Sequence, residues 1–301
     1  YDNDDIPYRL LIFVQMTGAL IVASGVEAFF TGQDLTIPVL GYVVMRAAST
    51  VQWLRAARAD PIHRPAALRY AGGTILVQVA WVLLLFVPEE FRIPGFFLLV
   101  LAELLVPVWA ESAVQTPWHA HHISERYGLF TILVLGEALL STSMAIRTAV
   151  DENGMTSNLT SIVLGGLLIV YAMWWLYFYQ PTHHFIISLR AVFVWAYGHW
   201  LIFGVTAAVG AGLAVAIDAA SHHAEISVET AGMAVALPTA IYVLCLWVLQ
   251  EHRRANSMID SLLNPVAALL ILLTPFTDQP VLFTGILLAV LVALGLIRHL
   301  E

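Results

Sequence analysis

ERYGLFTILVLGEALLS, residues 125–141, is an apolar segment interrupted by one carboxylate. The apolar segment around it, residues 126–147, is long enough to cross a bilayer core of about 30 Å. Glu137 stands near its middle, where an ionised side chain costs about 2.5–3.5 kcal/mol on insertion scales. The role of Glu137 therefore depends on what surrounds this helix.

The composition of the 301-residue chain is that of a membrane protein. Hydrophobic residues make up 60% of it and charged residues 11%, and the mean hydropathy is +0.82. Soluble chains carry about 25% charged residues. Apolar runs of roughly 18 or more residues recur along the whole length, which predicts an all-α, polytopic bundle of transmembrane helices. The only cysteine, Cys245, excludes an internal disulfide and any CxxC motif.

Hydropathy predicts about ten spans joined by short connections, so we expect one integral membrane domain. Several spans are interrupted or ended by Pro or Gly, and the span at 188–217 is long enough to tilt or break. The predicted spans are 7–30, 35–56, 67–88, 92–111, 126–147, 157–180, 188–217, 229–250, 260–276 and 279–298.

The arginines predict the orientation. The chain has no Lys, and when the connections are numbered alternately ten arginines fall on one side of the membrane and only Arg92 and Arg147 on the other. The positive-inside rule makes the first side cytoplasmic, which places both ends of this chain in the cytoplasm and the spans in the bacterial inner membrane. The chain begins at Tyr1 without Met or a visible signal peptide. No basic stripe suggests a nucleic-acid partner.

Three charged residues fall near the middle of predicted spans: Arg46, Glu103 and Glu137. Because one arginine faces two carboxylates, we predict that Glu103 or Glu137 lacks a buried cation and is protonated or titrates near neutral pH. Arg126 lies eleven residues, or roughly 16 Å along the axis, from Glu137 and cannot pair with it. Ser141, one turn beyond Glu137, is expected within hydrogen-bonding reach. The alternative is that Arg46 and Glu137 form a buried pair that fixes helix register.

The histidines offer a second set of candidates. His119 and His122 precede the fifth span with i,i+3 spacing and could share a metal ion or haem, as could His183 and His184 on the same side. The alternative is that these are interfacial histidines without a ligand, and the sequence requires no cofactor. His199 lies deeper, either as a proton-handling group or as a hydrogen-bonded packing residue.

Two stretches resemble a known family. HHISERYGLFTILVLGEALLS, residues 121–141, resembles the signature of the low-temperature-requirement A family of bacterial membrane proteins, which has an ERYGLF and LGE core. DNDDIPYRLLIFVQM, residues 2–16, is similar to the DD-x-x-x-RL stretch that the family carries after its second membrane helix. The matching residues here are Asp4, Asp5, Arg9, Glu125, Arg126, Tyr127, Gly128, Gly136 and Glu137.

The resemblance implies an integral membrane protein linked by name to growth in the cold. The family usually opens with an ELFFDLVFVFA-type helix and a Trp-rich second helix, and neither precedes Tyr1, so this chain is either a fragment or a divergent member. With both helices the total would be about twelve spans, which suggests a parallel repeat of six plus six. Residues 1–111 would then be the four-span remainder of the first half, and 112–301 the second half.

These observations favour a proton-coupled or ion-handling transporter whose transported species is a proton or small ion, moved with the help of the buried Arg and Glu residues. The alternative is a non-catalytic binding or structural subunit, either holding haem, metal or pigment at its histidines or packing in a larger complex or homo-oligomer. A lipid-modifying enzyme is a third hypothesis. It is supported only by residues 119–125, which are expected near the headgroup level. The expected partner in every case is the lipid bilayer.

Overall fold

The computed structural model describes residues 5–32, 34–179, 188–221, 225–251 and 258–299, and throughout these ranges every regular element is a helix. The predicted all-α fold class is confirmed. The chain divides into two compact units, residues 1–117 and 118–301, which are described separately. Four helices belong to the first unit and six to the second. A relation between the units by a repeat stays a prediction.

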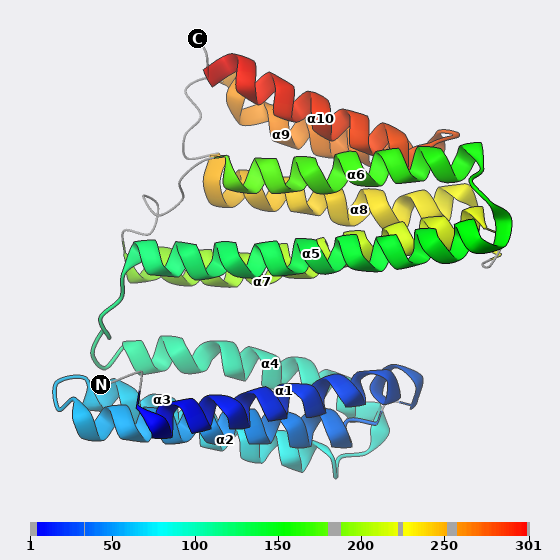
Figure 1. Ribbon diagram of the computed structural model, residues 1–301. Coiled ribbons are helices and arrows are strands. Elements are labelled where there is room, and N and C mark those ends of the chain that lie inside the picture. The colour runs from blue at the N-terminus through cyan, green and yellow to red at the C-terminus, as the bar shows by residue number, and fades with distance from the viewer. Residues whose placement is uncertain (1–4, 33, 180–187, 222–224, 252–257, 300–301) are drawn as a thin grey trace. The chain divides into compact units, whose positions relative to one another are not determined.

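In the first unit, helices that follow one another in the chain pack side by side: α1 on α2, α2 on α3 and α3 on α4 (Figure 1). The short connections between them explain this antiparallel order. Close approach of α1 and α2 depends on glycine, because a Cβ atom on Gly18 would lie 2.7 Å from the carbonyl oxygen of Gly41. The helices are α1 (Ile6–Gly32), α2 (Thr36–Ala59), α3 (Arg64–Leu84) and α4 (Glu89–Glu111).

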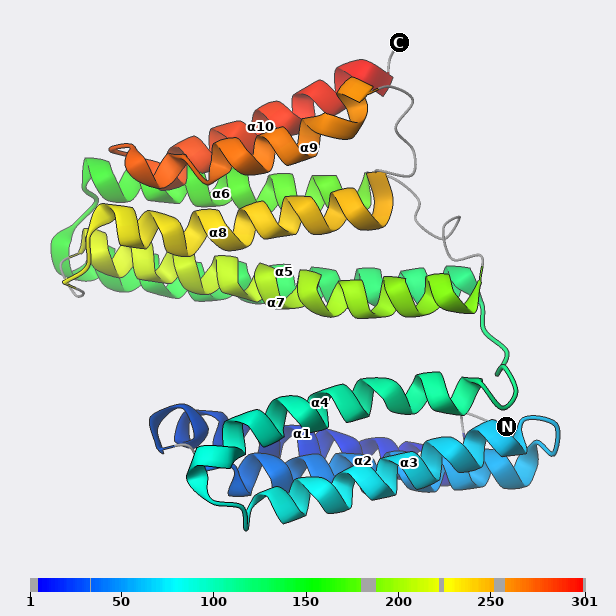
Figure 2. The ribbon, with the colours of Figure 1, turned by 180° about the vertical axis from the view of Figure 1, so that it is seen from behind.

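In the second unit, helices that are distant in the chain become neighbours: α5 packs on α7, and α6 packs on α10 (Figures 1 and 2). The helix α8 lies against both α7 and α9, and a π-helical turn at Trp247–Glu251 continues it. The helices are α5 (Ala120–Asn153), α6 (Ser157–Phe178), α7 (Leu189–Ala220), α8 (Val228–Leu246), α9 (Met258–Ile271) and α10 (Pro280–His299), with a 3₁₀ turn at Thr274–Phe276.

Large apolar side chains from α6, α7 and α8 form the core of the second unit. Ile169, Met173, Leu213 and Tyr242 are fully buried there. The Tyr242 hydroxyl donates a 2.8 Å hydrogen bond to the carbonyl oxygen of Met173, which satisfies its one polar atom. Because lipid tails are as apolar as these side chains, packing of atoms rather than transfer out of water holds such helices together.

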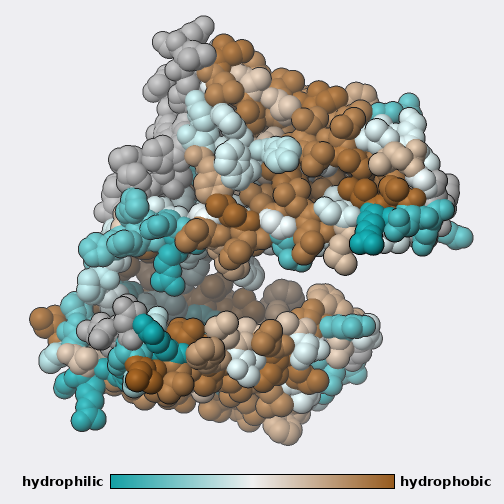
Figure 3. Space-filling view, in the orientation of Figure 1, coloured by the Kyte–Doolittle hydropathy of each residue, from teal (hydrophilic) through white to brown (hydrophobic). Residues whose placement is uncertain are grey.

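Eight helices of the described chain are long and apolar enough to span a membrane by length and composition. The exceptions are α2, which carries three arginines among polar residues, and α9, which is too short. Figure 3 shows mostly apolar residues along the helices, with hydrophilic residues gathered near helix ends. The chain is therefore an integral membrane protein whose least apolar helix, α2, packs between α1 and α3.

All ten predicted spans correspond to helices, and the largest difference is at α5. This helix begins six residues earlier than the predicted 126 and ends six residues later than the predicted 147. It stops where Gly154 adopts a positive φ of 71° and its N–H reaches back to the Val150 carbonyl oxygen. The long helix α7 is continuous, so the break that its length allowed does not occur.

Candidate functional site

An ion pair lies in the middle of the first unit. Arg46, at the centre of α2, pairs with Glu103 of α4. The other carboxylate oxygen of Glu103 accepts a 2.8 Å hydrogen bond from the Nε2 atom of Gln78 on α3. The Glu103 side chain is only 11% exposed and the Arg46 side chain 28%. Both partners donate to Glu103, so its two carboxylate oxygens each accept a hydrogen bond from a different helix.

Aromatic rings surround this pair. The guanidinium carbon of Arg46 lies 5.7 Å from the centroid of the Tyr42 ring, one helical turn earlier on α2. Tyr42 in turn meets the edge of Trp81, which is buried on α3 one turn after Gln78. Because the Glu103 side chain is only 11% exposed, its attraction to Arg46 is screened less than between surface side chains.

Three buried polar atoms of this cluster make no hydrogen bond to any described residue: Nε of Arg46, Oε1 of Gln78 and Nε1 of Trp81. About nine in ten buried polar groups in proteins have a partner, so three such atoms in one cluster are unusual. Two of them are N–H donors and the third is an acceptor. The cluster therefore has both donor and acceptor atoms that no described residue engages.

The partner of Arg46 is thus a carboxylate of its own unit. Sequence reasoning placed Arg46, Glu103 and Glu137 at similar depth and offered Glu137 as a possible partner of Arg46, whereas the structure pairs Arg46 with Glu103. It missed Gln78, which stands alone among apolar residues in TILVQVAWV, residues 74–82, and this isolated amide was the signal that could have found it. The hypothesis that one of the two carboxylates lacks a cation now concerns Glu137.

Glu137 lies on an exposed face of α5 within the second unit. Of the hydrogen bonds and ion pairs between described residues, none involves its carboxylate, and the expected bond with Ser141 is not formed. Leu133 and Leu140, one turn on either side, are 67% and 55% exposed. A Cβ atom on Gly136 would meet no atom within 4 Å. An apolar helix face with a lone carboxylate is therefore presented by this unit.

His199 of α7 is completely buried and bonded at both ring nitrogens. Its Nδ1 lies 2.8 Å from the Trp195 carbonyl oxygen, which can only accept, so Nδ1 carries the proton. Its Nε2 lies 2.8 Å from the Tyr177 hydroxyl. Both ring nitrogens thus have a partner, the geometry expected of a hydrogen-bonded packing residue. A proton-handling role for His199 stays a prediction.

The histidines at the start of α5 form an exposed cluster. The ring centroids of His119 and His122 are 5.7 Å apart, and His121 and His122 both approach the Glu125 carboxylate. The donor atoms of His121, His122 and Glu125 all lie within 4.8 Å of one another. His183 and His184, the other predicted ligands, lie outside the described residues.

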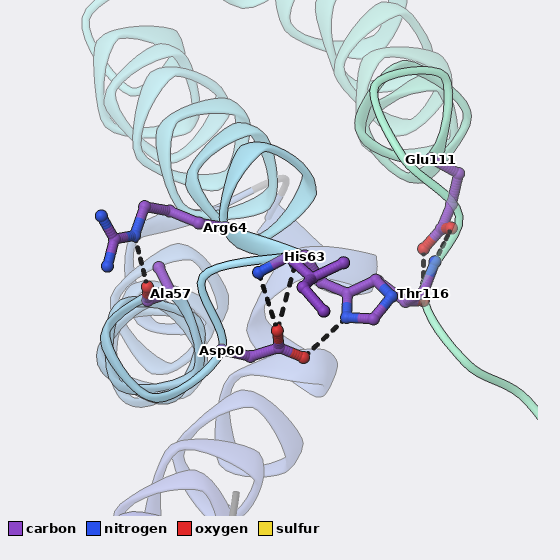
Figure 4. Close-up of polar contacts among 7 residues, drawn as sticks. Ala57, Asp60, His63, Arg64, Glu111 and Thr116 are labelled. Carbon is purple, nitrogen blue, oxygen red and sulfur yellow. Dashed lines mark hydrogen bonds and ion pairs between the residues drawn. The ribbon is translucent and has the colours of Figure 1, made fainter.

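Polar contacts stabilise the end of the first unit where α2 and α4 terminate (Figure 4). The carboxylate of Asp60, at the end of α2, lies 2.6 Å from Nδ1 of His63 and accepts hydrogen bonds from the backbone N–H groups of Ile62 and His63. At the end of α4, Glu111 accepts hydrogen bonds of 2.7 and 2.8 Å from the hydroxyl and backbone N–H of Thr116. The hydrogen bond from His63 lowers the pKa of the Asp60 carboxyl group below its ordinary 3.8.

We expect Asp60→Asn to remove part of the loss of stability that the first unit shows at low pH. Because the pKa of Asp60 is lower in the folded chain, its bonds contribute stability fully above the ordinary pKa, and this contribution is lost as pH falls through the lower folded pKa. The difference in melting temperature between wild type and Asp60→Asn in detergent should shrink between about pH 5 and pH 2. A constant difference over this range would contradict the assignment.

The start of α1 also carries an ion pair. Asp5 pairs with Arg55 of α2, and its other oxygen accepts a 2.9 Å hydrogen bond from the backbone N–H of Tyr8. The backbone N–H of Arg9 bonds to the Asp5 carbonyl oxygen in the same turn. Asp5 therefore caps α1 and ties it to α2. Asp4 lies outside the described residues.

The family model described as bacterial low temperature requirement A protein (LtrA) matches residues 1–297. The chain belongs to the LtrA family. It is similar to the uncharacterized protein RA0937 of Rhizobium meliloti (strain 1021), at 24% identity over 234 residues. That alignment covers 71% of this chain and 56% of RA0937, so the chain spans about half the length of this relative. No solved structure matches.

The residues of the LtrA signature on α5 lie in two different environments. Its first part packs inside the second unit: the ring of Tyr127 lies 5.0 Å from that of His199, and a Cβ atom on Gly128 would lie 3.4 Å from the Phe178 ring. Its second part, Gly136 and Glu137, lies on the exposed face. Glu125 and Arg126 are exposed at the start of the helix. The signature therefore combines residues that pack inside the second unit with residues that are exposed on its surface.

Proposed function

We propose that this LtrA chain is an ion-handling transporter, coupled to protons, whose charged site is the cluster of Arg46, Gln78 and Glu103. The observation that carries the proposal is an ion pair shared by three helices and bordered by buried polar atoms that the described chain does not use. Buried ionisable groups in membrane helices mark ion and proton pathways by default, because they are expensive to keep there.

The chemistry of the cluster links protonation to helix packing. While Glu103 is ionised, Arg46 and Gln78 both donate to it, which ties α2 and α3 to α4. Protonation of Glu103 would leave the Arg46 charge without its counter-ion in a low-dielectric site. The unit would then favour an arrangement in which Arg46 finds another acceptor. Such a change in relative stability is what couples proton uptake to a conformational change.

The buried polar atoms without a hydrogen-bond partner indicate which kind of transported species the cluster could bind. Nε of Arg46 and Nε1 of Trp81 are donors, whereas Oε1 of Gln78 is an acceptor. A water molecule that carries protons, or a small ion with one or two bound waters, matches a set with both kinds of atom. We propose a proton or small ion as the transported species on this ground.

Proton flux into proteoliposomes with an entrapped pH dye tests the proposal. We expect Glu103→Gln in the full-length protein to abolish potential-driven flux, because the amide can neither bind nor release a proton in this pH range. Glu89→Gln is the matched control, since Glu89 is an exposed residue in the first turn of the same helix. Equal flux in wild type and Glu103→Gln would contradict the assignment of the site.

Glu137→Gln belongs in the same experiment, because Glu137 is the second carboxylate in the middle of a predicted span. Loss of flux in this variant, with flux retained in Glu89→Gln, would place Glu137 on the proton pathway as well. Flux absent from the folded wild type would contradict an uncoupled proton path and favour the alternative function.

That alternative is a non-catalytic binding or structural subunit, and one observation favours it. The exposed face of α5 around Glu137 is apolar, as expected of a surface that packs in a complex. A purified protein that carries pigment or haem, or that retains a partner in mild detergent, would support this role. In either role we propose a bacterial inner-membrane location with both ends of the chain in the cytoplasm, on the basis of the arginine distribution.

A further inference from the structure

The start of α5 places three metal-ligand side chains on adjoining positions. His121 and Glu125 are one turn apart, and His122 lies next to His121 and three residues before Glu125. The Oε2 atom of Glu125 is 3.9 Å from Nδ1 of His121 and 3.7 Å from Nδ1 of His122. These distances bring two imidazole nitrogens and one carboxylate oxygen around a single point.

The spacing is close to what a tetrahedral ion requires. Zinc–nitrogen and zinc–oxygen bonds of about 2.0–2.1 Å put neighbouring ligand atoms roughly 3.4 Å apart. The three donor atoms already lie within 4.8 Å of one another, so side-chain rotations alone can close the set. His121 and His122 are 72% and 73% exposed, which leaves room for such rotations. Solvent can supply the fourth ligand.

Two features of the helix bear on metal binding at this place. The side chain of His119, the residue before the first turn, makes no capping hydrogen bond, and the first turn holds no acidic residue. A metal ion bound by His121 and Glu125 would tie the first two turns together and so compensate for the missing cap. The positive end of the helix dipole opposes a cation, and the Glu125 carboxylate offsets this repulsion.

We propose that His121, His122 and Glu125 bind a first-row divalent metal ion of the zinc type, with His119 beside the site. Imidazole and carboxylate are ligands that zinc prefers, and two nitrogens with one oxygen resemble its three-ligand, open sites. The ring of His119 lies 5.7 Å from that of His122 and can serve as a fourth ligand or orient His122. The site is independent of the transport proposal, which rests on the other unit.

Cobalt and zinc titrations of the full-length protein, purified without a histidine tag, test the proposal. Other paired histidines, at 183–184 and 222–223, would add background binding, so these four are changed to Gln in the reference variant. We expect the reference variant to bind one Co²⁺ per chain with visible absorption bands of a four-coordinate ion, and Zn²⁺ to displace it.

The ligand variants decide the outcome. His122→Ala and Glu125→Gln should each weaken Zn²⁺ binding about 10- to 100-fold, which is the loss seen when even an outer-shell partner of a metal ligand is removed. His63→Gln is the control, because His63 is an imidazole that bonds to a carboxylate in the first unit. Unchanged melting temperatures would show that the variants fold. Absence of stoichiometric binding in the reference variant, or equal affinity in all variants, would overturn the proposal.

Discussion

We expect Glu103→Leu to lower the free energy of unfolding of the four-helix unit by about 3 kcal/mol, the lower end of the range for breaking a buried ion pair. The loss arises because Arg46 keeps its charge but no longer has the carboxylate that compensates it. The Nε2 atom of Gln78 loses its acceptor at the same time. We take the lower end because the Arg46 side chain is 28% exposed. The measurement is unfolding in mixed micelles with increasing denaturing detergent.

A double variant separates lost pairing from lost packing. Arg46→Met combined with Glu103→Leu removes both charges and retains apolar volume, so it should recover most of the stability that Glu103→Leu loses. Glu89→Leu on the same helix α4 controls for the change of residue type, since Glu89 is exposed in the first turn. If the double variant were as unstable as Glu103→Leu alone, the ion pair would not be the cause.

Gly212→Ala is expected to destabilise the second unit by about 1–3 kcal/mol, as overpacking of a close contact does. A Cβ atom on Gly212 of α7 would overlap the backbone carbonyl oxygen of Ala234 on α8. Backbone atoms cannot rotate away as side chains can, so the two helices must separate. Melting temperature in detergent measures the effect.

Gly204 on the same helix is the matched control. A Cβ atom there would meet nothing within 4 Å, so Gly204→Ala should be neutral or stabilising by up to about 1 kcal/mol through helix propensity. Both glycines belong to one small-residue ladder in the sequence, at 204, 208 and 212. Equal losses in the two variants would mean that the contact between α7 and α8 is not the source of the effect.

The helices could be predicted because hydropathy and length are local properties of a sequence. Even α2, whose composition falls short of a typical span, was predicted as a helix of nearly the observed length. The ends were less accurate where a helix continues beyond its apolar part toward charged residues, as α5 does from Thr148 to Asn153. Hydropathy does not distinguish a helix that ends at the membrane from one that continues beyond it.

The partners of charged residues could not be predicted in the same way. Depth along a helix follows from position, but the choice of Glu103 as the partner of Arg46 depends on how α2 and α4 are rotated about their axes. The same holds for the ladder of small residues at 204, 208 and 212. Of its two glycines only Gly212 lies in close contact with a neighbouring helix, and the sequence does not show which one does.

The histidine cluster illustrates a third limit. Their i,i+3 spacing suggested His119 and His122 as the pair that shares a metal ion or haem. In the structure α5 begins at Ala120, so His119 is the residue before the helix and its backbone is extended. His121 and His122, which are inside the helix, come closest to Glu125. The pairing of His119 with His122 assumed a helix over residues 118–125, and the observed start at Ala120 leaves His119 outside that helix.

The polar composition of α2 has a consequence for how the protein is made. An isolated segment with Arg46 at its centre and further arginines after it partitions poorly into lipid as it leaves the ribosome and translocon. Its neighbours α1 and α3 are apolar enough to span by length and composition, but α4 supplies the countercharge, Glu103, only 57 residues after Arg46 in the chain. We therefore expect α2 to be committed to the membrane late, when Glu103 arrives.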